Sequence, residues 1–166
     1  KGSGVLLHIS SLPSRFGIGT FGKEARKFVR FLHSAHQKYW QILPLNPTSY
    51  GDSPYQSFSA FALNPYFIDL EYLLKREYLT KEDLKTLKIT RKNRFVDYGY
   101  IYETRFPLLR KAAEKAYLVE EEKINNFAKR EKSWLDDYSL FMTIKNEQGG
   151  ASFLEWPHEL RMHKKA

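Results

Sequence analysis

The 166-residue sequence contains no cysteine and no hydrophobic run long enough to cross a bilayer. The absence of cysteine excludes disulfides, thiolate catalysis and cysteine-ligated metal sites. A membrane-spanning helix needs about 20 consecutive apolar residues, so we expect no membrane partner. The first residues, K-G-S-G-V-L-L-H, also lack the layout of a signal peptide. From these absences we expect a soluble, cytoplasmic protein.

The histidines are few and show no metal-binding pattern. Five are present, and the nearest pair, His33 and His36, lacks a third ligand close by in the sequence. Structural zinc sites use about four ligands, so we expect no metal. His8 lies at the end of an apolar run, where we interpret it as a structural histidine rather than a catalytic one.

A stripe of one charge is lacking as well, although the sequence is basic overall. Twenty-seven Lys and Arg against nineteen Asp and Glu give a formal net charge of +8. Residues 1–70 carry seven basic and three acidic groups, and residues 71–166 carry twenty and sixteen, so each part is near +4. A solvated basic surface explains this even spread, and we expect no nucleic-acid partner. A basic nucleic-acid-binding domain is kept as an alternative.

What the sequence does contain is a strand–helix–strand pattern. Residues 4–9 and 39–45 are short apolar runs, typical of strands that are buried on both faces. Between them, apolar residues at helical spacing predict a helix within residues 21–32, with Thr20 as its N-cap. Such a βαβ unit belongs to a largely parallel sheet. The loops after the two strands should therefore line one face, where ligands bind in such folds.

The loop at residues 50–65, Y-G-D-S-P-Y-Q-S-F-S-A-F-A-L-N-P, combines aromatic rings with hydroxyl, amide and carboxylate groups. Aromatic faces stack on the apolar faces of a sugar ring or a base, and short polar groups reach the edges of the ligand. The composition therefore favours a sugar-binding loop. Asp52 is equally suited to forming an Asx turn, because G-D-S-P is typical turn chemistry.

The second half of the sequence has helical patterns and no third buried strand after residue 45. Thr80 and Asp83 resemble a capping box, and Pro107 fits a helix only in its first turn. Two parallel strands cannot close a sheet, so we expect an α/β fold: the first βαβ part of a larger barrel, followed by a mostly helical insertion. We divide the chain into a barrel segment with substrate-binding loops (1–72), a helical insertion (73–150) and the start of a return to the barrel (151–166).

Five segments carry a family resemblance. They are G-V-L-L-H-I-S-S-L-P-S (4–14), F-G-I-G-T-F-G (16–22), Y-W-Q-I-L-P-L-N-P-T (39–48), Y-G-D-S-P-Y-Q-S-F-S-A-F-A (50–62) and N-P-Y-F-I-D-L (64–70). Together they closely resemble the N-terminal region of the 4-alpha-glucanotransferases, the amylomaltases or disproportionating enzymes of glycoside hydrolase family 77. V-D-Y-G (96–99) and F-L-E-W-P (153–157) fit the same family.

The resemblance implies a TIM-like (β/α)8 barrel and a retaining transfer of alpha-1,4-glucan segments between maltooligosaccharides, without a cofactor. Retention uses two carboxyl groups about 5–5.5 Å apart. The family carries its catalytic carboxylates on later barrel strands, and none of those motifs occurs here. We therefore expect the N-terminal part of such an enzyme, with the remainder of its barrel as a partner and with no catalytic residue of its own. A non-catalytic glucan-binding fragment is the alternative.

The resemblance also implies substrate-binding residues in the loop at residues 50–65. Tyr55 of S-P-Y-Q aligns with a tyrosine that packs against the glucose on the donor side of the cleavage point. Asp52 and Ser53 are the expected polar partners of sugar hydroxyls, with Gln56 beside them. Tyr50 resembles one tyrosine of a second glucan site away from the catalytic cleft, for which Tyr98 is the expected second residue and Tyr100 the alternative.

One position departs from the family pattern. Where the family usually has glycine in A-G-Q-x-Y-W, this sequence has His36 in A-H-Q-K-Y-W. If the position requires a positive φ, a residue other than glycine costs about 1 kcal/mol. We expect this cost to fall on the stability of the βαβ unit.

Overall fold

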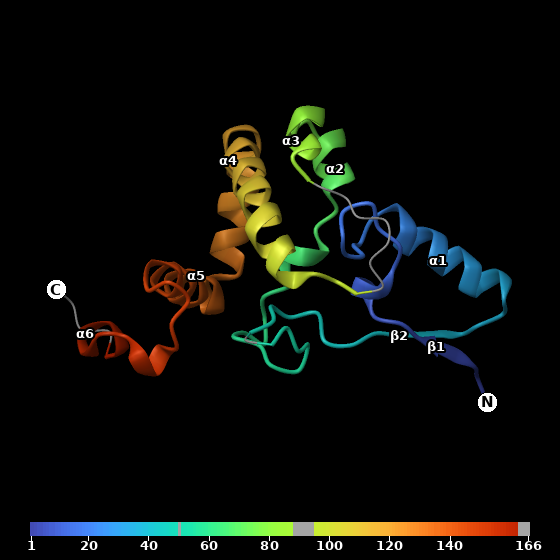
Figure 1. Ribbon diagram of the computed structural model, residues 1–166, viewed down its shortest axis with the longest axis horizontal. Coiled ribbons are helices and arrows are strands. Elements are labelled where there is room, and N and C mark those ends of the chain that lie inside the picture. Colours follow the sequence, from blue (N-terminus) through green and yellow to red (C-terminus); the bar gives the residue numbers. More distant parts are fainter. Residues whose placement is uncertain (50, 88–94, 163–166) are drawn as a thin grey trace. The chain divides into compact units, whose positions relative to one another are not determined.

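The computed structural model describes residues 1–49, 51–87 and 95–162 (Figure 1). The chain divides into two compact units, Lys1–Glu121 and Glu122–Ala166, which are described separately below. Among the described residues, no helix combines the length and the apolar character that crossing a membrane requires. The division at residues 72 and 150 expected from the sequence stays a prediction.

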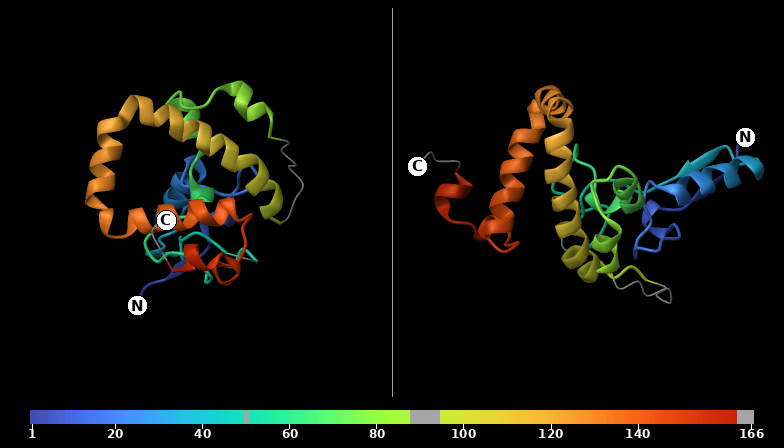
Figure 2. Two further views of the ribbon diagram at one scale, coloured as in Figure 1. Left: turned by 90° about the vertical axis from the view of Figure 1, so that its left-hand side faces the viewer. Right: turned by 90° about the horizontal axis from the view of Figure 1, so that it is seen from above.

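The first unit begins with the expected strand–helix–strand arrangement. Strand β1 (Gly4–Leu6) pairs in parallel with β2 (Tyr39–Gln41), and Val5 lies opposite Trp40. Helix α1 (Lys23–Ser34) connects the strands and runs beside them in Figures 1 and 2. Phe28 of α1 packs edge-on against Trp40, with 4.9 Å between the ring centroids. The prediction of a parallel pair joined by a helix is confirmed.

The burial of the two strands differs from the prediction. Each strand has only three residues, and on the face away from α1 the side chains of Leu6 and Tyr39 are 57% and 66% exposed. Successive side chains of a strand point to opposite faces, so one face packs on α1 and the other does not. Burial on both faces is therefore wrong for this chain, because within the described residues the sheet contains β1 and β2 alone.

The N-terminus of α1 also differs from the prediction. The N-cap is Gly22 rather than Thr20, and the Thr20 hydroxyl instead donates to Asp69 Oδ2 at 2.8 Å. Asp69 itself caps α2 (Leu70–Lys75), where its Oδ1 accepts from the Tyr72 N–H at 2.7 Å. A Cβ at Gly22 would lie 1.6 Å from Asp69 Oδ2. Thr20 therefore ties the loop after β1 to the N-P-Y-F-I-D-L segment instead of starting the helix.

His36 adopts the backbone conformation that its family position suggests. Its φ is 53°, directly after the end of α1, and its N–H donates to the His33 carbonyl at 3.1 Å. A side chain in this left-handed region costs about 1 kcal/mol relative to glycine. The turn into β2 is thus formed at some expense in stability.

Two further helices complete the first unit. Helix α3 (Lys81–Lys85) begins with the predicted capping box, in which Thr80 N–H donates to Asp83 Oδ2 at 2.8 Å. Helix α4 (Tyr98–Arg130) contains Pro107 well inside its length, so the prediction that Pro107 lies in a first turn is wrong. The helical dihedral angles of α4 are interrupted at Glu120 (φ −124°, ψ 29°), next to the boundary between the two units.

Two hydrophobic clusters form the core of the first unit. One lies among α2, α3 and α4 and contains Phe16, Leu70, Tyr78, Leu79, Leu84, Leu87, Leu108 and Ala112. The other lies beneath the loop after β1 and contains Ile9, Leu12, Ile18, Ala25, Tyr66, Phe67 and Ile101. The second cluster matters for function, because polar residues next to its members line the cavity described below.

The second unit contains the end of α4, helix α5 (Lys132–Glu147), the 3-10 turn η3 (Phe153–Glu155) and helix α6 (His158–Arg161). Helix α5 is followed by Gly149 and Gly150 with φ of 63° and 83°, and the Gly150 N–H donates to the Lys145 carbonyl at 2.8 Å. Trp156 of F-L-E-W-P is buried and stacks on Phe141 at 5.2 Å between centroids. The contacts described for this unit join residues that lie close together in the sequence.

Candidate functional site

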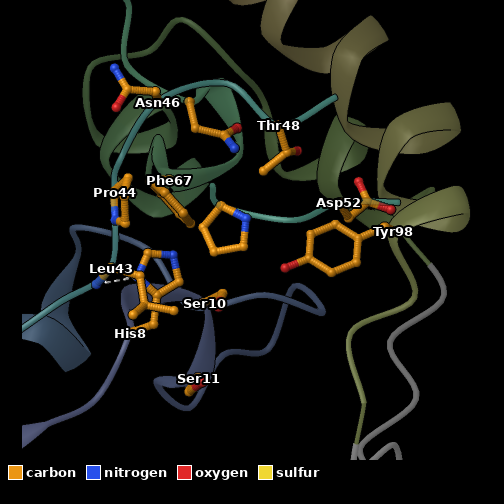
Figure 3. A pocket seen from close by; sticks show the side chains of 12 residues that line it. His8, Ser10, Ser11, Leu43, Pro44, Asn46, Thr48, Asp52, Phe67 and Tyr98 are labelled. Carbon is orange, nitrogen blue, oxygen red and sulfur yellow. Dashed lines mark hydrogen bonds between the residues drawn. The ribbon is translucent and has the colours of Figure 1, made fainter. Parts of the chain in front are cut away.

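A cavity of about 150 Å³ lies in the first unit where the chain leaves β1 and β2 (Figure 3). We call residues 8–20 the β1 wall and the described residues of 42–64 the β2 wall. The lining residues are His8, Ser10, Ser11, Leu43, Pro44, Asn46, Thr48, Asp52, Pro54, Asn64, Phe67 and Tyr98. The loops after two parallel strands therefore line one site, as predicted for the ligand-binding side of such a sheet.

The β1 wall is supported by buried apolar side chains. Ile9 and Ile18 are 1% and 2% exposed. The loop closes on itself, because the Gly19 N–H donates to the Ser10 carbonyl at 3.0 Å. A Cβ at Gly19 would lie 1.9 Å from the Ile9 carbonyl oxygen, so the approach depends on glycine. The result is a closely packed turn whose serines reach the cavity.

His8 lines the cavity at the start of the β1 wall. Its Nδ1 accepts a hydrogen bond from the Leu43 N–H at 3.3 Å, which joins the ends of the two strands. The imidazole also meets the Phe67 ring edge-on at 5.3 Å between centroids. Burial lowers the pKa of His8 below its ordinary value, so the ring is neutral near pH 7. A neutral ring with Nδ1 accepting carries its proton on Nε2.

The β2 wall is held mainly by hydrogen bonds between its two ends. The Asn64 N–H donates to the Leu45 carbonyl at 2.8 Å, and the Asn46 side-chain amide donates to the Ala62 carbonyl at 3.1 Å. Further along the loop, Thr48 and Ser57 form an antiparallel bridge. These bonds close the loop near its base. Within the loop, Asp52 faces the cavity whereas Tyr55 is exposed to solvent.

Asp52 lies in this loop at a turn with a left-handed backbone. Its φ is 54°, and its N–H donates to the Ser49 carbonyl at 3.1 Å. Burial raises the pKa of the Asp52 carboxyl, while a hydrogen bond from the Thr48 side chain opposes this. The turn places the carboxyl group in the lining of the cavity. Asp52 is thus a turn residue through its backbone, but not through an Asx turn, because Pro54, two residues on, has no N–H to donate to its carboxyl group.

Two tyrosines, Tyr98 and Tyr66, lie within electrostatic reach of this carboxyl group. Tyr98 is half-buried at the start of α4, and its side chain is hydrogen-bonded to Ser10. Burial raises the pKa of Tyr98, and the charge of Asp52 adds to the effect. Burial first, and then the same charge, raise the pKa of Tyr66 to about 12. The cavity thus combines a carboxylate with protonated hydroxyl groups, a set that can donate to and accept from a polyhydroxylated ligand.

The other residues predicted from the sequence lie outside the cavity lining. Tyr55 is 73% exposed, and its N–H donates to Ser53 Oγ at 3.4 Å. The Ser53 carbonyl accepts from the Gln56 N–H at 3.1 Å, and the Gln56 side chain is exposed. Tyr50 lies outside the described residues. The structure therefore brings Asp52 and Tyr98 together in the cavity lining, leaves Tyr55 and Gln56 exposed to solvent, and keeps Ser53 half-buried outside the lining.

Several lining residues were given no binding role from the sequence. His8 was interpreted as structural, and Asn46, Thr48 and Asn64 were not singled out. Both asparagines precede a proline, in N-P-T and N-P-Y, and the residue before proline is restricted to extended conformations. This restriction could have identified both asparagines from the sequence as residues with a fixed backbone at the two ends of the loop.

The described lining of the cavity supplies mainly groups that form hydrogen bonds. Among the described residues that line the cavity, Asp52 supplies the one carboxyl group. Within the described ranges, no three metal-ligating side chains are grouped so that they could hold one metal ion. The site offers hydrogen-bond donors, acceptors and ring faces.

Comparisons with known proteins agree with these features. A family model described as 4-alpha-glucanotransferase matches residues 7–166. The chain is 48% identical over 158 residues to the 4-alpha-glucanotransferase of Clostridium butyricum and 49% identical over 162 residues to that of Thermus thermophilus, covering 95% of this chain in each case. It also resembles the amylomaltase from Streptococcus agalactiae in complex with acarbose, with a TM-score of 0.90, 44% identity and 99% of this chain covered. The chain spans about a third of the length of these relatives, 32%, 31% and 33% respectively.

Proposed function

Because the chain belongs to the 4-alpha-glucanotransferase family, we propose that it forms part of the glucan-binding site of an enzyme that transfers alpha-1,4-glucan segments between maltooligosaccharides. The observation that carries this proposal is the cavity at the ends of two parallel strands, with Asp52 beside hydroxyl groups. Such a lining suits the hydroxyl groups of a sugar ring. Acarbose, bound in the similar amylomaltase structure, supports the choice of a carbohydrate ligand.

We propose further that β1 and β2 are two strands of a TIM-like (β/α)8 barrel. The parallel pairing and the connecting helix α1 support this, because they match one repeat of such a barrel. The exposure of Leu6 and Tyr39 supports it too, since their face of the sheet is apolar and uncovered. The remainder of the barrel is the partner that would cover it.

In this proposal the chain binds the glucan and other parts of the barrel break the bond. A retaining transfer requires two carboxyl groups about 5–5.5 Å apart. Asp52 is the one carboxyl group among the described lining residues. We therefore expect no glucan transfer by the 166 residues alone, and we assign no catalytic residue to them.

The proposed contacts follow from where each side chain lies. Asp52 reaches the cavity and accepts from sugar hydroxyls, and Tyr55 is exposed enough for its ring to stack on a glucose face. Ser53 and Gln56, in the same turn, are proposed as weaker polar contacts. Tyr50 and Tyr98 are kept as the proposed pair for a second glucan site. Because Tyr98 also lines the cavity beside Asp52, we propose that this second site adjoins the cavity rather than lying away from it.

Titration of the 166-residue chain with maltoheptaose, followed by NMR, tests the proposal. We expect saturable shifts in the β2 wall, and we expect Tyr55→Ala to weaken binding by up to about tenfold, because a stacked ring contributes about 0.5–1.5 kcal/mol and 1.4 kcal/mol is tenfold. Tyr72→Ala is the matched control, since Tyr72 is an exposed tyrosine on α2. No shifts with maltoheptaose, together with salt-sensitive binding of an oligonucleotide, would overturn the proposal in favour of nucleic acid.

A further inference from the structure

We propose that His8 is a glucan-binding residue, which donates its Nε2–H to a hydroxyl group of a sugar ring in the cavity. The inference rests on the proposed function and adds a residue whose predicted role was structural. Three observations carry it: the orientation of the His8 ring, the position of its proton, and the size and charge of the cavity that the ring lines.

The orientation of the ring is fixed by two contacts. The Leu43 N–H binds Nδ1 at 3.3 Å, and the edge-on contact with Phe67 holds the ring plane. Among the described residues, Nε2 has no hydrogen-bond partner, although His8 lines the cavity. In Figure 3 the imidazole of His8 and the hydroxyl of Tyr98 enter the cavity from opposite sides. Nε2 is thus the unused polar atom of a ring that is already held in place.

The position of the proton follows from the same hydrogen bond. A backbone N–H can bind only an unprotonated Nδ1, so the proton of the neutral ring is on Nε2. Burial lowers the pKa of His8 and thereby favours the neutral form near pH 7. His8 therefore offers the cavity one fixed, uncharged donor. Asp52, on the β2 wall, offers an acceptor.

These groups select a neutral polyhydroxylated ring over other small ligands. A hydroxyl group both accepts and donates, so one ring can accept from His8 and donate to Asp52. An anion would meet the Asp52 carboxylate without a compensating cation in the lining. A cavity of about 150 Å³, a volume on the order of one that holds benzene, leaves room for no more than one sugar ring. A glucose unit of an alpha-glucan satisfies all three conditions.

Two substitutions separate the structural role of His8 from its binding role. His8→Asn places an amide oxygen near the position of Nδ1, which keeps an acceptor for the Leu43 N–H, but it removes the Nε2 donor. His8→Gln places an amide N–H near the position of Nε2, but it removes the Nδ1 acceptor. We expect His8→Asn to melt like the unmodified chain and to bind maltoheptaose about fivefold more weakly, the size of one hydrogen bond. We expect His8→Gln to melt lower while binding with nearly unchanged affinity.

A spectroscopic measurement on the unmodified chain completes the test. In a long-range ¹H–¹⁵N spectrum of the imidazole, we expect His8 to show the Nε2–H tautomer and its Nε2 signal to move when maltoheptaose is added. Unchanged His8 signals, with His8→Asn binding as tightly as the unmodified chain, would show that His8 is purely structural while the proposed function stands. Failure of the unmodified chain to bind maltoheptaose would overturn both. If neither variant folds, the spectrum of the unmodified chain still decides whether His8 contacts the ligand: its Nε2 signal moves on addition of maltoheptaose if it does and stays in place if it does not.

Discussion

The two walls of the cavity are built by different forces. The β1 wall is anchored from below by Ile9 and Ile18, whose side chains are almost fully buried. The β2 wall is closed by hydrogen bonds at its base, and it leaves Tyr55 exposed to solvent. Burial of a large apolar side chain contributes about 1.5–3 kcal/mol, whereas a typical hydrogen bond contributes about 0.5–1.5 kcal/mol net. The β1 wall should therefore be the more stable of the two.

This difference suits the proposed site, which would have to hold a sugar ring and still admit it. A segment with few buried apolar contacts and many exposed hydrogen bonds opens locally at low free-energy cost. The β2 wall has that character, and it carries the proposed glucan contacts. The β1 wall carries the proposed donor, His8, and the serines Ser10 and Ser11, which also line the cavity. Three substitutions test this contrast.

The largest effect is expected for Ile9→Ala in the β1 wall. Truncation of a fully buried isoleucine removes its burial and leaves a cavity, which lowers the free energy of unfolding by about 2–5 kcal/mol. Leu6→Ala is the matched control, because Leu6 is an aliphatic residue nearby in the sequence but largely exposed. Urea denaturation of both variants measures the difference. Similar losses in the two variants would show that burial does not anchor the β1 wall.

An intermediate effect is expected for Asn64→Ala in the β2 wall. The Asn64 Oδ1 accepts from the buried Tyr66 N–H at 3.0 Å at the start of the 3-10 turn η2 (Pro65–Phe67). Removal of this acceptor should lower the free energy of unfolding by about 0.5–2 kcal/mol, the usual cost of losing a cap. Amide hydrogen exchange should also show faster opening of the β2 wall than of the β1 wall. In Asn64→Ser, which keeps an acceptor, we expect a smaller loss, and a loss equal to that of alanine would contradict the role of this bond.

The sequence predicted the parts of the fold that depend on local patterns. The parallel pair around α1, the capping box at Thr80 and the convergence of both loops on one side all follow from spacing and turn chemistry. Long-range contacts were beyond it. The Thr20 hydroxyl binds Asp69, forty-nine residues away, so a residue that resembles a helix cap serves another purpose.

The candidate site was predictable to a similar degree. Composition pointed to the loop at residues 50–65 and the family resemblance to Asp52 within it, and Asp52 does line the cavity. The sequence predicts a structural role for His8, and its Nδ1 does bind the Leu43 backbone. The binding role proposed for Nε2 of His8 depends on the cavity, because sequence spacing carries no information about which atom of a side chain faces a ligand.

The smallest effect in the comparison of the two walls is expected from Asp52 and depends on pH. Burial raises its pKa above the ordinary value of 3.8, so the folded chain binds this proton more tightly than the unfolded chain does. The carboxyl group therefore favours folding most at low pH, and this contribution is lost as pH rises from about the ordinary pKa through the raised one. Tyr66 and Tyr98 titrate above this window, because the pKa of each is raised from 10.0.

Asp52→Asn removes the titration while keeping a residue that tolerates positive φ. We expect the variant to gain stability relative to the unmodified chain as pH is raised from 3 to 7, and urea denaturation at both values measures the gain. His8 is present in both chains, so its own titration cancels in the difference. Asp137→Asn in α5 is the control, because Asp137 is exposed. If the stability difference between the two chains stayed constant with pH, the Asp52 carboxyl group would be solvated rather than buried in the cavity. Asp52 would then not face a ligand held against the β1 wall.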